Sequence, residues 1–279
     1  MTALRQLFDL EHHGADTYVG VGPRYPWGGL YGGQIVAQAL RAAAFTVESD
    51  LEPHSLRAYF IRRGDHTEPI RFEVDRLRNG RSFSTRRVVA RQAVGAILNL
   101  EVSFQRPEPA PEVQTIEVPR GIPRPDELEG TSWTESFDRR WVSADALVEP
   151  VRTGTGRTAA WMRVNDELGD DQLLQRCWLA YLSDDLPTDA VVRAHPVYAE
   201  LGEAAWEHVM SASLDHTVWF HRPVRADRWH LHEFTCHHVV GGRGLALGQI
   251  FDEDGVHVAT VAQEVLMRDR RAHQTDARA

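Results

Sequence analysis

Lysine is absent from this sequence of 279 residues, and all 31 basic residues are arginines. Acidic residues number 40, so the formal net charge at pH 7 is −9. A protein that binds nucleic acid along a broad surface needs a basic face, and the acidic balance therefore argues against that class. Arginine does suit bidentate contacts to phosphate, so a local arginine cluster that binds a small anionic ligand stays open.

Cysteine is scarce as well, with only Cys177 and Cys236 and no Cys-x-x-Cys pair. This excludes a finger built on paired cysteines and a thioredoxin-like redox motif. No long apolar run occurs, and residues 1–22 carry acidic and histidine side chains instead. The sequence therefore predicts neither a membrane span nor a signal peptide, and we expect a cytoplasmic protein with two free thiols.

Proline is concentrated between residues 106 and 125, where six prolines alternate with charged and small residues. Such a composition is typical of an extended linker. We predict an N-terminal domain over residues 1–105, a proline-rich linker over 106–130, a C-terminal domain over 131–268 and a polar tail over 269–279.

Each half begins with a segment whose apolar residues recur at helical spacing and continues with strand patterns. The spacing predicts helices over 34–47 and 171–183. Strands are predicted over 56–61, 70–77, 82–90 and 96–104 in the first half, and over 216–221, 228–238, 245–251 and 257–267 in the second. Because the strands are consecutive and joined by hairpin-length turns, the expected class is α+β, an antiparallel sheet with helices packed on it.

The two halves also resemble each other. The segment from Gly80 to Arg106 can be laid on that from Gly242 to Arg268 without a gap, which places Glu101 opposite Gln263. Such a duplication is typical of a repeated structural unit. The position that corresponds to Asp184 then falls within residues 43–45, which contain no carboxylate, so only one half would carry a complete catalytic set.

Several ordered motifs extend this comparison beyond the chain itself. They are Leu30-Tyr31-Gly32-Gly33-Gln34-Ile35-Val36-Ala37-Gln38, His54-Ser55-Leu56-Arg57-Ala58-Tyr59-Phe60, Arg81-Ser82-Phe83-Ser84-Thr85-Arg86-Arg87, Ala180-Tyr181-Leu182-Ser183-Asp184, Leu214-Asp215-His216-Thr217-Val218-Trp219-Phe220-His221-Arg222-Pro223 and Gln263-Glu264-Val265-Leu266-Met267. Together they resemble the acyl-CoA thioesterase II family over roughly residues 5–268.

The resemblance implies a tandem (double) hotdog fold, in which each half is a long helix wrapped by an antiparallel β-sheet. It implies hydrolysis of fatty acyl-CoA to free fatty acid and CoA, with acyl-CoA as the substrate and no metal or organic cofactor. It also implies assembly into a homo-oligomer.

Thioester hydrolysis needs an activated water molecule and a stabilised oxyanion. The resemblance assigns the water to three side chains: Asp184 as the general base, Ser213 where most relatives carry threonine, and Gln263 on the last strand. Asp185 is a rival carboxylate and Thr217 a rival hydroxyl. Gln263 is also notable on its own, because it interrupts an apolar strand face, and a buried amide must find hydrogen-bond partners.

Two further groups are candidates for substrate binding. Backbone amides at a helix N-terminus bind anions, so Gly32, Gly33 and Gln34 are expected to hold the oxyanion or the thioester carbonyl. The CoA phosphates are expected to meet Arg62, Arg86 and Arg87, with Arg63 and Arg91 beside them. The alternative for each of these arginines is that it lies on a solvent-exposed strand face and does not bind CoA.

Three other interpretations stay open. A non-catalytic acyl-CoA or lipid binding protein would keep the fold without the chemistry. An enoyl-CoA hydratase would need Asp215 with His216, but adjacent strand residues face opposite sides. A zinc site would need His230, His232, Cys236 and His238, which alternate onto one strand face without the spacing of a zinc finger. No Gly-x-Ser-x-Gly motif supports a serine hydrolase.

Overall fold

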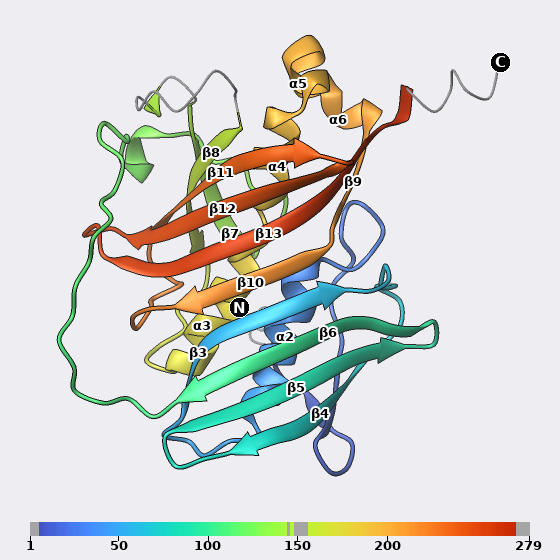
Figure 1. The fold of residues 1–279 in the computed structure, drawn as a ribbon, viewed down its shortest axis with the longest axis vertical. Helices are drawn as coiled ribbons and strands as arrows, with labels where there is room; N and C mark the ends of the chain where they lie inside the picture. The colour runs from blue at the N-terminus through green and yellow to red at the C-terminus, as the bar shows by residue number, and fades with distance from the viewer. Residues whose placement is uncertain (1–5, 144–145, 148–155, 272–279) are drawn as a thin grey trace.

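A single antiparallel sheet and two long helices dominate the computed structural model, which describes residues 6–143, 146–147 and 156–271. Figure 1 shows the sheet in front with both helices behind it. In the first half the elements are β1 (Glu11–His12), β2 (Thr17–Gly20), α2 (Gly32–Ala44), β3 (Glu52–Phe60), β4 (Ile70–Asn79), β5 (Phe83–Gln92) and β6 (Gly95–Gln105).

The second half repeats this succession and adds short helices. Its elements are η1 (Pro125–Glu127), β7 (Phe137–Val142), β8 (Arg157–Val164), α3 (Gln172–Ser183), α4 (Pro187–Ala194), α5 (Pro196–Leu201), η3 (Gly202–Ala204), α6 (Ala205–His208), β9 (Val209–Ser213), β10 (Asp215–Phe220), β11 (His230–Val240), β12 (Arg243–Asp252) and β13 (His257–Asp269). Both predicted helices and all eight predicted strands are confirmed within a few residues. The helices between 187 and 208 were not predicted.

The strand order is palindromic. It runs β1-β2-β4-β5-β6-β3-β10-β13-β12-β11-β8-β7, so each strand of the first half has a counterpart at the mirrored position of the second. The halves join where β3 pairs antiparallel with β10 and Arg57 lies opposite Thr217. The sheet therefore passes without a break from one half to the other.

The register corrects the gap-free overlay of the two halves. In the first half, Arg86 of β5 pairs with Val102 of β6. In the second half, the counterpart of Arg86 is Ala246 of β12, 160 positions later, and it pairs with Gln263 of β13. Because the β12–β13 hairpin contains one more residue than the β5–β6 hairpin, the counterpart of Gln263 is Val102. Glu101, the residue predicted at this position, is exposed on the outer face.

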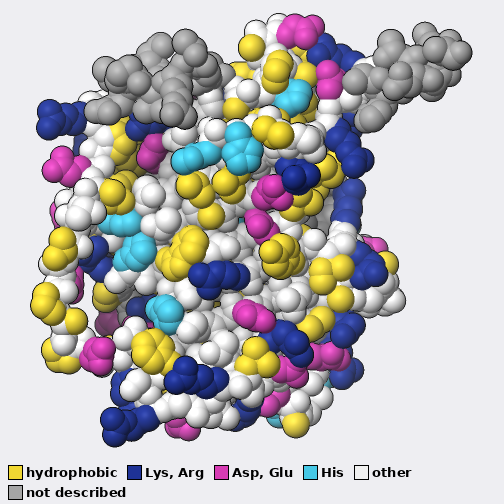
Figure 2. Space-filling view, viewed as in Figure 1, with side chains coloured by type: hydrophobic (Ala, Val, Ile, Leu, Met, Phe, Trp, Pro, Cys, Tyr) yellow, Lys and Arg dark blue, Asp and Glu magenta, His cyan; other side chains and the backbone are white. Residues whose placement is uncertain are grey.

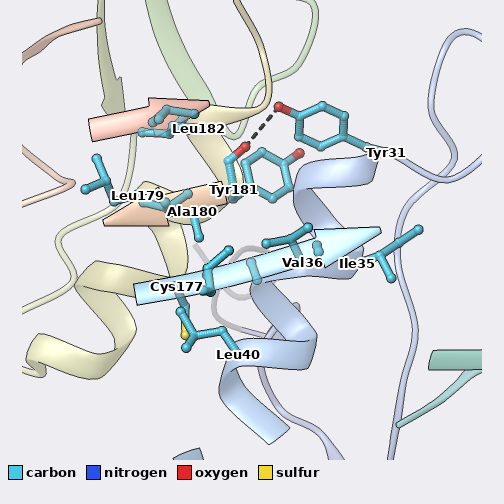
Figure 3. Close-up of a cluster of buried hydrophobic side chains, with 14 of the residues drawn as sticks. Tyr31, Ile35, Val36, Leu40, Cys177, Leu179, Ala180, Tyr181 and Leu182 are labelled. Atoms are coloured by element: carbon cyan, nitrogen blue, oxygen red, sulfur yellow. Dashed lines mark hydrogen bonds between the residues drawn. The ribbon is translucent and has the colours of Figure 1, made fainter. Parts of the chain in front are cut away.

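The two long helices pack against each other on the inner side of the sheet (Figure 3). The Tyr31 hydroxyl, just before α2, donates a 2.9 Å hydrogen bond to the carbonyl of Tyr181 in α3. The helices approach closely here, since a Cβ at Gly33 would lie 2.4 Å from that carbonyl oxygen. This contact brings the C-terminal end of α3 to the N-terminal end of α2.

The proline-rich segment adopts no helix or strand before η1, as predicted, but it is not a free tether. Ile116, Val118, Ile122 and Leu128 pack against a small buried cluster on the outer face of the second half. The Trp161 indole N–H also donates to the Pro123 carbonyl at 2.9 Å. The linker thus covers part of the second half. The tail beyond residue 271 lies outside the described residues.

Candidate active site

Asp184 lies where the two helices meet. It is the C-cap residue of α3, and its carboxylate reaches the N-terminus of α2, where a Cβ on Gly32 would come within 2.6 Å of Oδ2. Helix α2 has no side-chain N-cap and no acidic residue in its first turn. Helix N-termini favour negative charge, and the Asp184 carboxylate at the end of α3 provides the negative charge that the first turn of α2 lacks.

The surroundings of Asp184 suit a proton acceptor at neutral pH. The residue is only 7% exposed, and burial is the main reason that its pKa is raised to about 7. Repulsion from Asp185 adds to this increase, while hydrogen bonds from the Gly33 amide and Gln263 oppose it. Among the described residues Oδ1 has no hydrogen-bond partner. One carboxylate oxygen is therefore held by the protein and the other is left to accept a proton.

Asp185 has a different role, although it is adjacent in sequence. Its Oδ1 accepts a 2.6 Å hydrogen bond from the Trp133 indole, and its Oδ2 forms a 2.7 Å ion pair with Arg139. Both oxygens are thus engaged in contacts that fasten α3 to the segment before β8. Of the two adjacent carboxylates, only Asp184 has an oxygen without a hydrogen-bond partner among the described residues.

The structure brings Ser213 and Gln263 together with Asp184. Gln263 is fully buried on β13, and its Nε2 donates a 2.8 Å hydrogen bond to Ser213 Oγ. Its Oε1 lies 2.5 Å from His216 Nδ1, and that nitrogen is 3.9 Å from Asp184 Oδ1. These four residues form one connected polar cluster.

His216 and Ser183 are members of this cluster that the sequence reasoning missed. His216 is fully buried, and its Nε2 lies 2.8 Å from Ser183 Oγ. The sequence reasoning considered His216 only together with Asp215, which faces the other side of the strand and accepts from the Glu264 amide. Thr217 shares that outer side, so it is not a rival to Ser213. The alternation of buried residues along β10 was the signal for His216.

At the N-terminus of α2, one of the backbone amides expected to bind the oxyanion already has a hydrogen-bond partner within the protein. Because the Gly33 amide hydrogen-bonds to Asp184, it is not free for a substrate carbonyl. The Gln34 side chain accepts from Tyr25 at 2.7 Å and donates to Gln38 at 3.1 Å, so it belongs to an internal network. Binding of the oxyanion by the backbone amides of Gly32 and Gln34 stays a prediction.

The arginine prediction is wrong for Arg86, which is buried, and for Arg87 it stays a prediction. Arg86 is only 1% exposed and donates to Thr46 and to the Asn79 side chain, so it cannot reach a phosphate. Arg87 points away from the helices and pairs with Asp75 at 2.5 Å. Figure 2 shows arginine and acidic side chains interspersed on this outer face of the sheet. Arg62 is exposed beside the Ala96 carbonyl, and its role stays a prediction.

The histidines of β11 do not share one face as predicted. A β-bulge between Cys236 and His238 interrupts the alternation, so His238 is exposed whereas His230 and His232 are fully buried. In the described part of the chain, no group of three or more histidine, cysteine, aspartate or glutamate side chains could hold a metal ion. The zinc interpretation therefore has no geometric support.

His232→Leu is expected to stabilise the protein by about 1 kcal/mol at pH 7, because both ring nitrogens are buried and have no hydrogen-bond partner among the described residues. Burial holds the pKa of His232 far below its usual value, so the imidazole must lose any proton on folding. The stability gap between the variant and the parent should therefore widen as the pH falls below about 6.5. Urea unfolding at several pH values measures it. His230→Leu is the control, since it removes a 2.9 Å bond to the Arg228 carbonyl and should destabilise.

Residues 22–105 match the acyl-CoA thioesterase N-terminal domain, and residues 106–267 match the acyl-CoA thioesterase C-terminal domain. The chain belongs to the acyl-CoA thioesterase II family. Acyl-CoA thioesterase 2 of Haemophilus influenzae is 36% identical, over 86% of this chain and 87% of that protein. Acyl-coenzyme A thioesterase 8 of Rattus norvegicus is 34% identical, over 86% of this chain and 81% of that protein.

Solved structures agree with this membership of the acyl-CoA thioesterase II family. The acyl-CoA thioesterase II of Mycobacterium marinum superposes with a TM-score of 0.83 at 35% identity, covering 96% of this chain and 98% of that one. A protein with a hotdog fold from Alicyclobacillus acidocaldarius superposes with a TM-score of 0.77 at 21% identity, covering 96% and 98%, which supports the fold alone. None of the helices in the described ranges is long and apolar enough to span a bilayer.

Proposed function

We propose that this protein hydrolyses fatty acyl-CoA to a free carboxylic acid and CoA, with Asp184 as the general base. The observation that carries the assignment is the buried carboxylate of Asp184, whose Oδ1 has no hydrogen-bond partner in the described structure and whose pKa is raised to about 7. A general base works best when its pKa lies near the working pH. Membership of the acyl-CoA thioesterase II family supplies the substrate class.

In the proposed reaction, a water molecule donates a hydrogen bond to Asp184 Oδ1 and gives up that proton as its oxygen attacks the thioester carbon. The carbonyl oxygen gains the negative charge, and the tetrahedral intermediate then expels the CoA thiolate, which takes the proton from Asp184. Ser213 holds the water, because its hydroxyl keeps its own proton as a donor after accepting from Gln263, and Gln263 orients that hydroxyl. The proposed steps use side chains and water alone.

We infer that the two halves are two hotdog units in one chain. The palindromic strand order and the pairing of β3 with β10 support this inference. The C-terminal family match begins at residue 106, so the proline-rich segment that packs on the second half belongs with that unit. Assembly into a homo-oligomer stays a prediction that sedimentation analysis would test.

We infer a single catalytic centre per chain. Gln263 has Val102 as its counterpart in the first half, and His216 has Leu56, both fully buried and apolar. The C-cap residue of α2 is Phe45, whereas the C-cap residue of α3 is Asp184. The first half thus lacks counterparts of Gln263, His216 and Asp184, and its contribution is the helix N-terminus that holds the carboxylate of Asp184.

Free thiol release from acyl-CoAs of different chain lengths tests the function. We expect release that depends on the enzyme concentration for at least one chain length. A protein that releases no thiol from any substrate, yet gains thermal stability from acyl-CoA, would be a binding protein and the proposal would be wrong. Acyl carnitines of the same chain lengths are the control, since they offer an oxygen ester without the CoA thioester, and their hydrolysis is followed by release of the free fatty acid.

The pH dependence follows from the proton affinity of Asp184. Only the ionised carboxylate can accept a proton, so kcat/KM should fall about tenfold per pH unit below about pH 7 and level off above it. Asp189 is the matched control, because burial raises its pKa to about 7 as well, but it lies outside the cluster. Asp189→Asn should leave the profile unchanged. A parent profile that stays flat from pH 5 to 7 would contradict the role of Asp184.

A further inference from the structure

We propose that His216 is a positioning residue for this hydrolysis, which holds the Gln263 side-chain amide in the one orientation that turns its N–H groups toward Asp184 and Ser213. The proposal rests on the proposed function, because it explains how the general base and its partners are kept aligned. His216 would touch neither the water nor the substrate and would act through Gln263.

The argument begins with the donors and acceptors of Gln263. A side-chain amide can be turned by half a rotation at little steric cost, so its orientation is set by its neighbours. An ionised Asp184 carboxylate only accepts hydrogen bonds, and the hydrogen bond from Gln263 to it requires that Nε2 face the carboxylate. The same nitrogen donates to Ser213 Oγ. Both amide hydrogens are then used, and Oε1 must face His216.

This orientation of Gln263 determines which ring nitrogen of His216 carries the proton. Oε1 can only accept, so the 2.5 Å contact requires a proton on His216 Nδ1. Burial lowers the pKa of His216 to about 4, so the ring is neutral at pH 7 and Nε2 carries a lone pair. The Ser183 hydroxyl lies 2.8 Å from Nε2 and 2.9 Å from the Ala180 carbonyl, and its one proton can be shared between that lone pair and the carbonyl oxygen. Ser183, His216 and Gln263 thus form a relay that ends at the catalytic carboxylate.

A neutral imidazole at this position has a second consequence for Asp184. The distance of 3.9 Å between His216 Nδ1 and Asp184 Oδ1 is too long for a hydrogen bond, and the Nδ1 proton is already committed to Gln263. The histidine therefore does not compete with the water for Oδ1. Partners that orient a ligand in this indirect way commonly contribute about 10- to 100-fold to activity at metal sites, and we expect a similar size here.

The chain itself offers the matched substitution. Leu56 occupies the position that corresponds to His216 in the first half, where it is fully buried on the same face of the sheet. His216→Leu therefore removes the donor with a side chain that this fold accepts. His216→Asn is the conservative variant, because an asparagine amide N–H can replace the Nδ1–H. Ser183→Ala removes the partner of Nε2 together with a local hydrogen bond to the Ala180 carbonyl.

The test measures kcat and KM for acyl-CoA hydrolysis in the parent and the two His216 variants, with melting temperatures as the check on folding. We expect His216→Leu to lower kcat about 10- to 100-fold with KM within about twofold of the parent, and His216→Asn to recover most of the loss. A kcat of His216→Leu within twofold of the parent would overturn the proposal. So would an asparagine variant as slow as the leucine variant, because the side chain would then act through its shape.

A second readout does not depend on activity. Two-dimensional 15N–1H spectra of the parent's imidazole rings should show His216 with its proton on Nδ1 and none on Nε2 at pH 7, and Ser183→Ala should weaken this preference. A ring protonated on Nε2 would contradict the relay even in an active enzyme. A parent that releases no thiol while its His216 carries the proton on Nδ1 would contradict the proposed function and with it a role in hydrolysis.

Discussion

Asp184→Asn is expected to lower kcat for acyl-CoA hydrolysis by at least about 100-fold while leaving the fold intact. Asparagine keeps the shape and can still accept from the Gly33 amide, but it cannot take a proton from water. Free thiol release at saturating acyl-CoA measures the effect. The melting temperature should not fall. Burial raises the folded-state pKa of Asp184 above its unfolded value, so the ionised carboxylate lowers stability above about pH 7 and its loss should stabilise there.

Asp185→Asn is the matched control for this prediction, because the two carboxylates are adjacent on the chain. Asp185 forms a buried ion pair with Arg139 and accepts from Trp133, so its loss should lower stability more than it lowers kcat per folded molecule. If the variants behaved the other way round, with chemistry lost at Asp185 and retained at Asp184, the general base would be assigned to the wrong carboxylate.

Arg86→Met is expected to lower the free energy of unfolding by roughly 3 kcal/mol, a large fraction of the stability of a typical domain. The guanidinium is buried at the C-terminal end of α2, where it donates to the Thr46 carbonyl at 2.8 Å and to Asn79 Oδ1 at 2.7 Å. It also donates to the Arg78 carbonyl at 2.8 Å. Methionine fills a similar volume but leaves these acceptors buried without a donor. Urea unfolding with parallel circular dichroism measures the loss.

The same variant tests whether Arg86 contacts the substrate. At a temperature where the variant remains folded, KM for acyl-CoA should match that of the parent, because the side chain does not reach the surface. Arg87→Gln provides the comparison, since an exposed ion pair such as that with Asp75 contributes about 1 kcal/mol or less. A raised KM in Arg86→Met with unchanged stability would restore Arg86 as a phosphate ligand.

Much of the fold followed from local pattern. The helices around Gln34 and Cys177 and the strand alternation that ends at Phe104 depend on spacing within a few residues, so the sequence predicted them. The helices between 187 and 208 were missed because they are short, so the helical spacing of apolar residues does not repeat within them.

The contacts within the site could not be predicted from the sequence, because they depend on strand register and on how the helices cross. One additional residue in the β12–β13 hairpin shifts the register of the last strand, so Val102 rather than Glu101 corresponds to Gln263. Alternation along β5 also put Arg86 on the inner face, where a charged residue was not expected. Asp184, Ser213 and Gln263 were predicted from the family resemblance, whereas the position of Asp184 over the N-terminus of α2 depends on how two helices cross.

Single-turnover hydrolysis in water enriched in 18O, with enzyme in excess over acyl-CoA, tests the central claim most directly. If Asp184 activates water, the carboxylic acid formed in the first turnover carries one solvent 18O, and the Asp184 side chain remains unlabelled. Unlabelled acid in the first turnover, with 18O appearing in Asp184, would mean that the carboxylate attacks the thioester itself, and the account of Asp184 as a general base would be wrong.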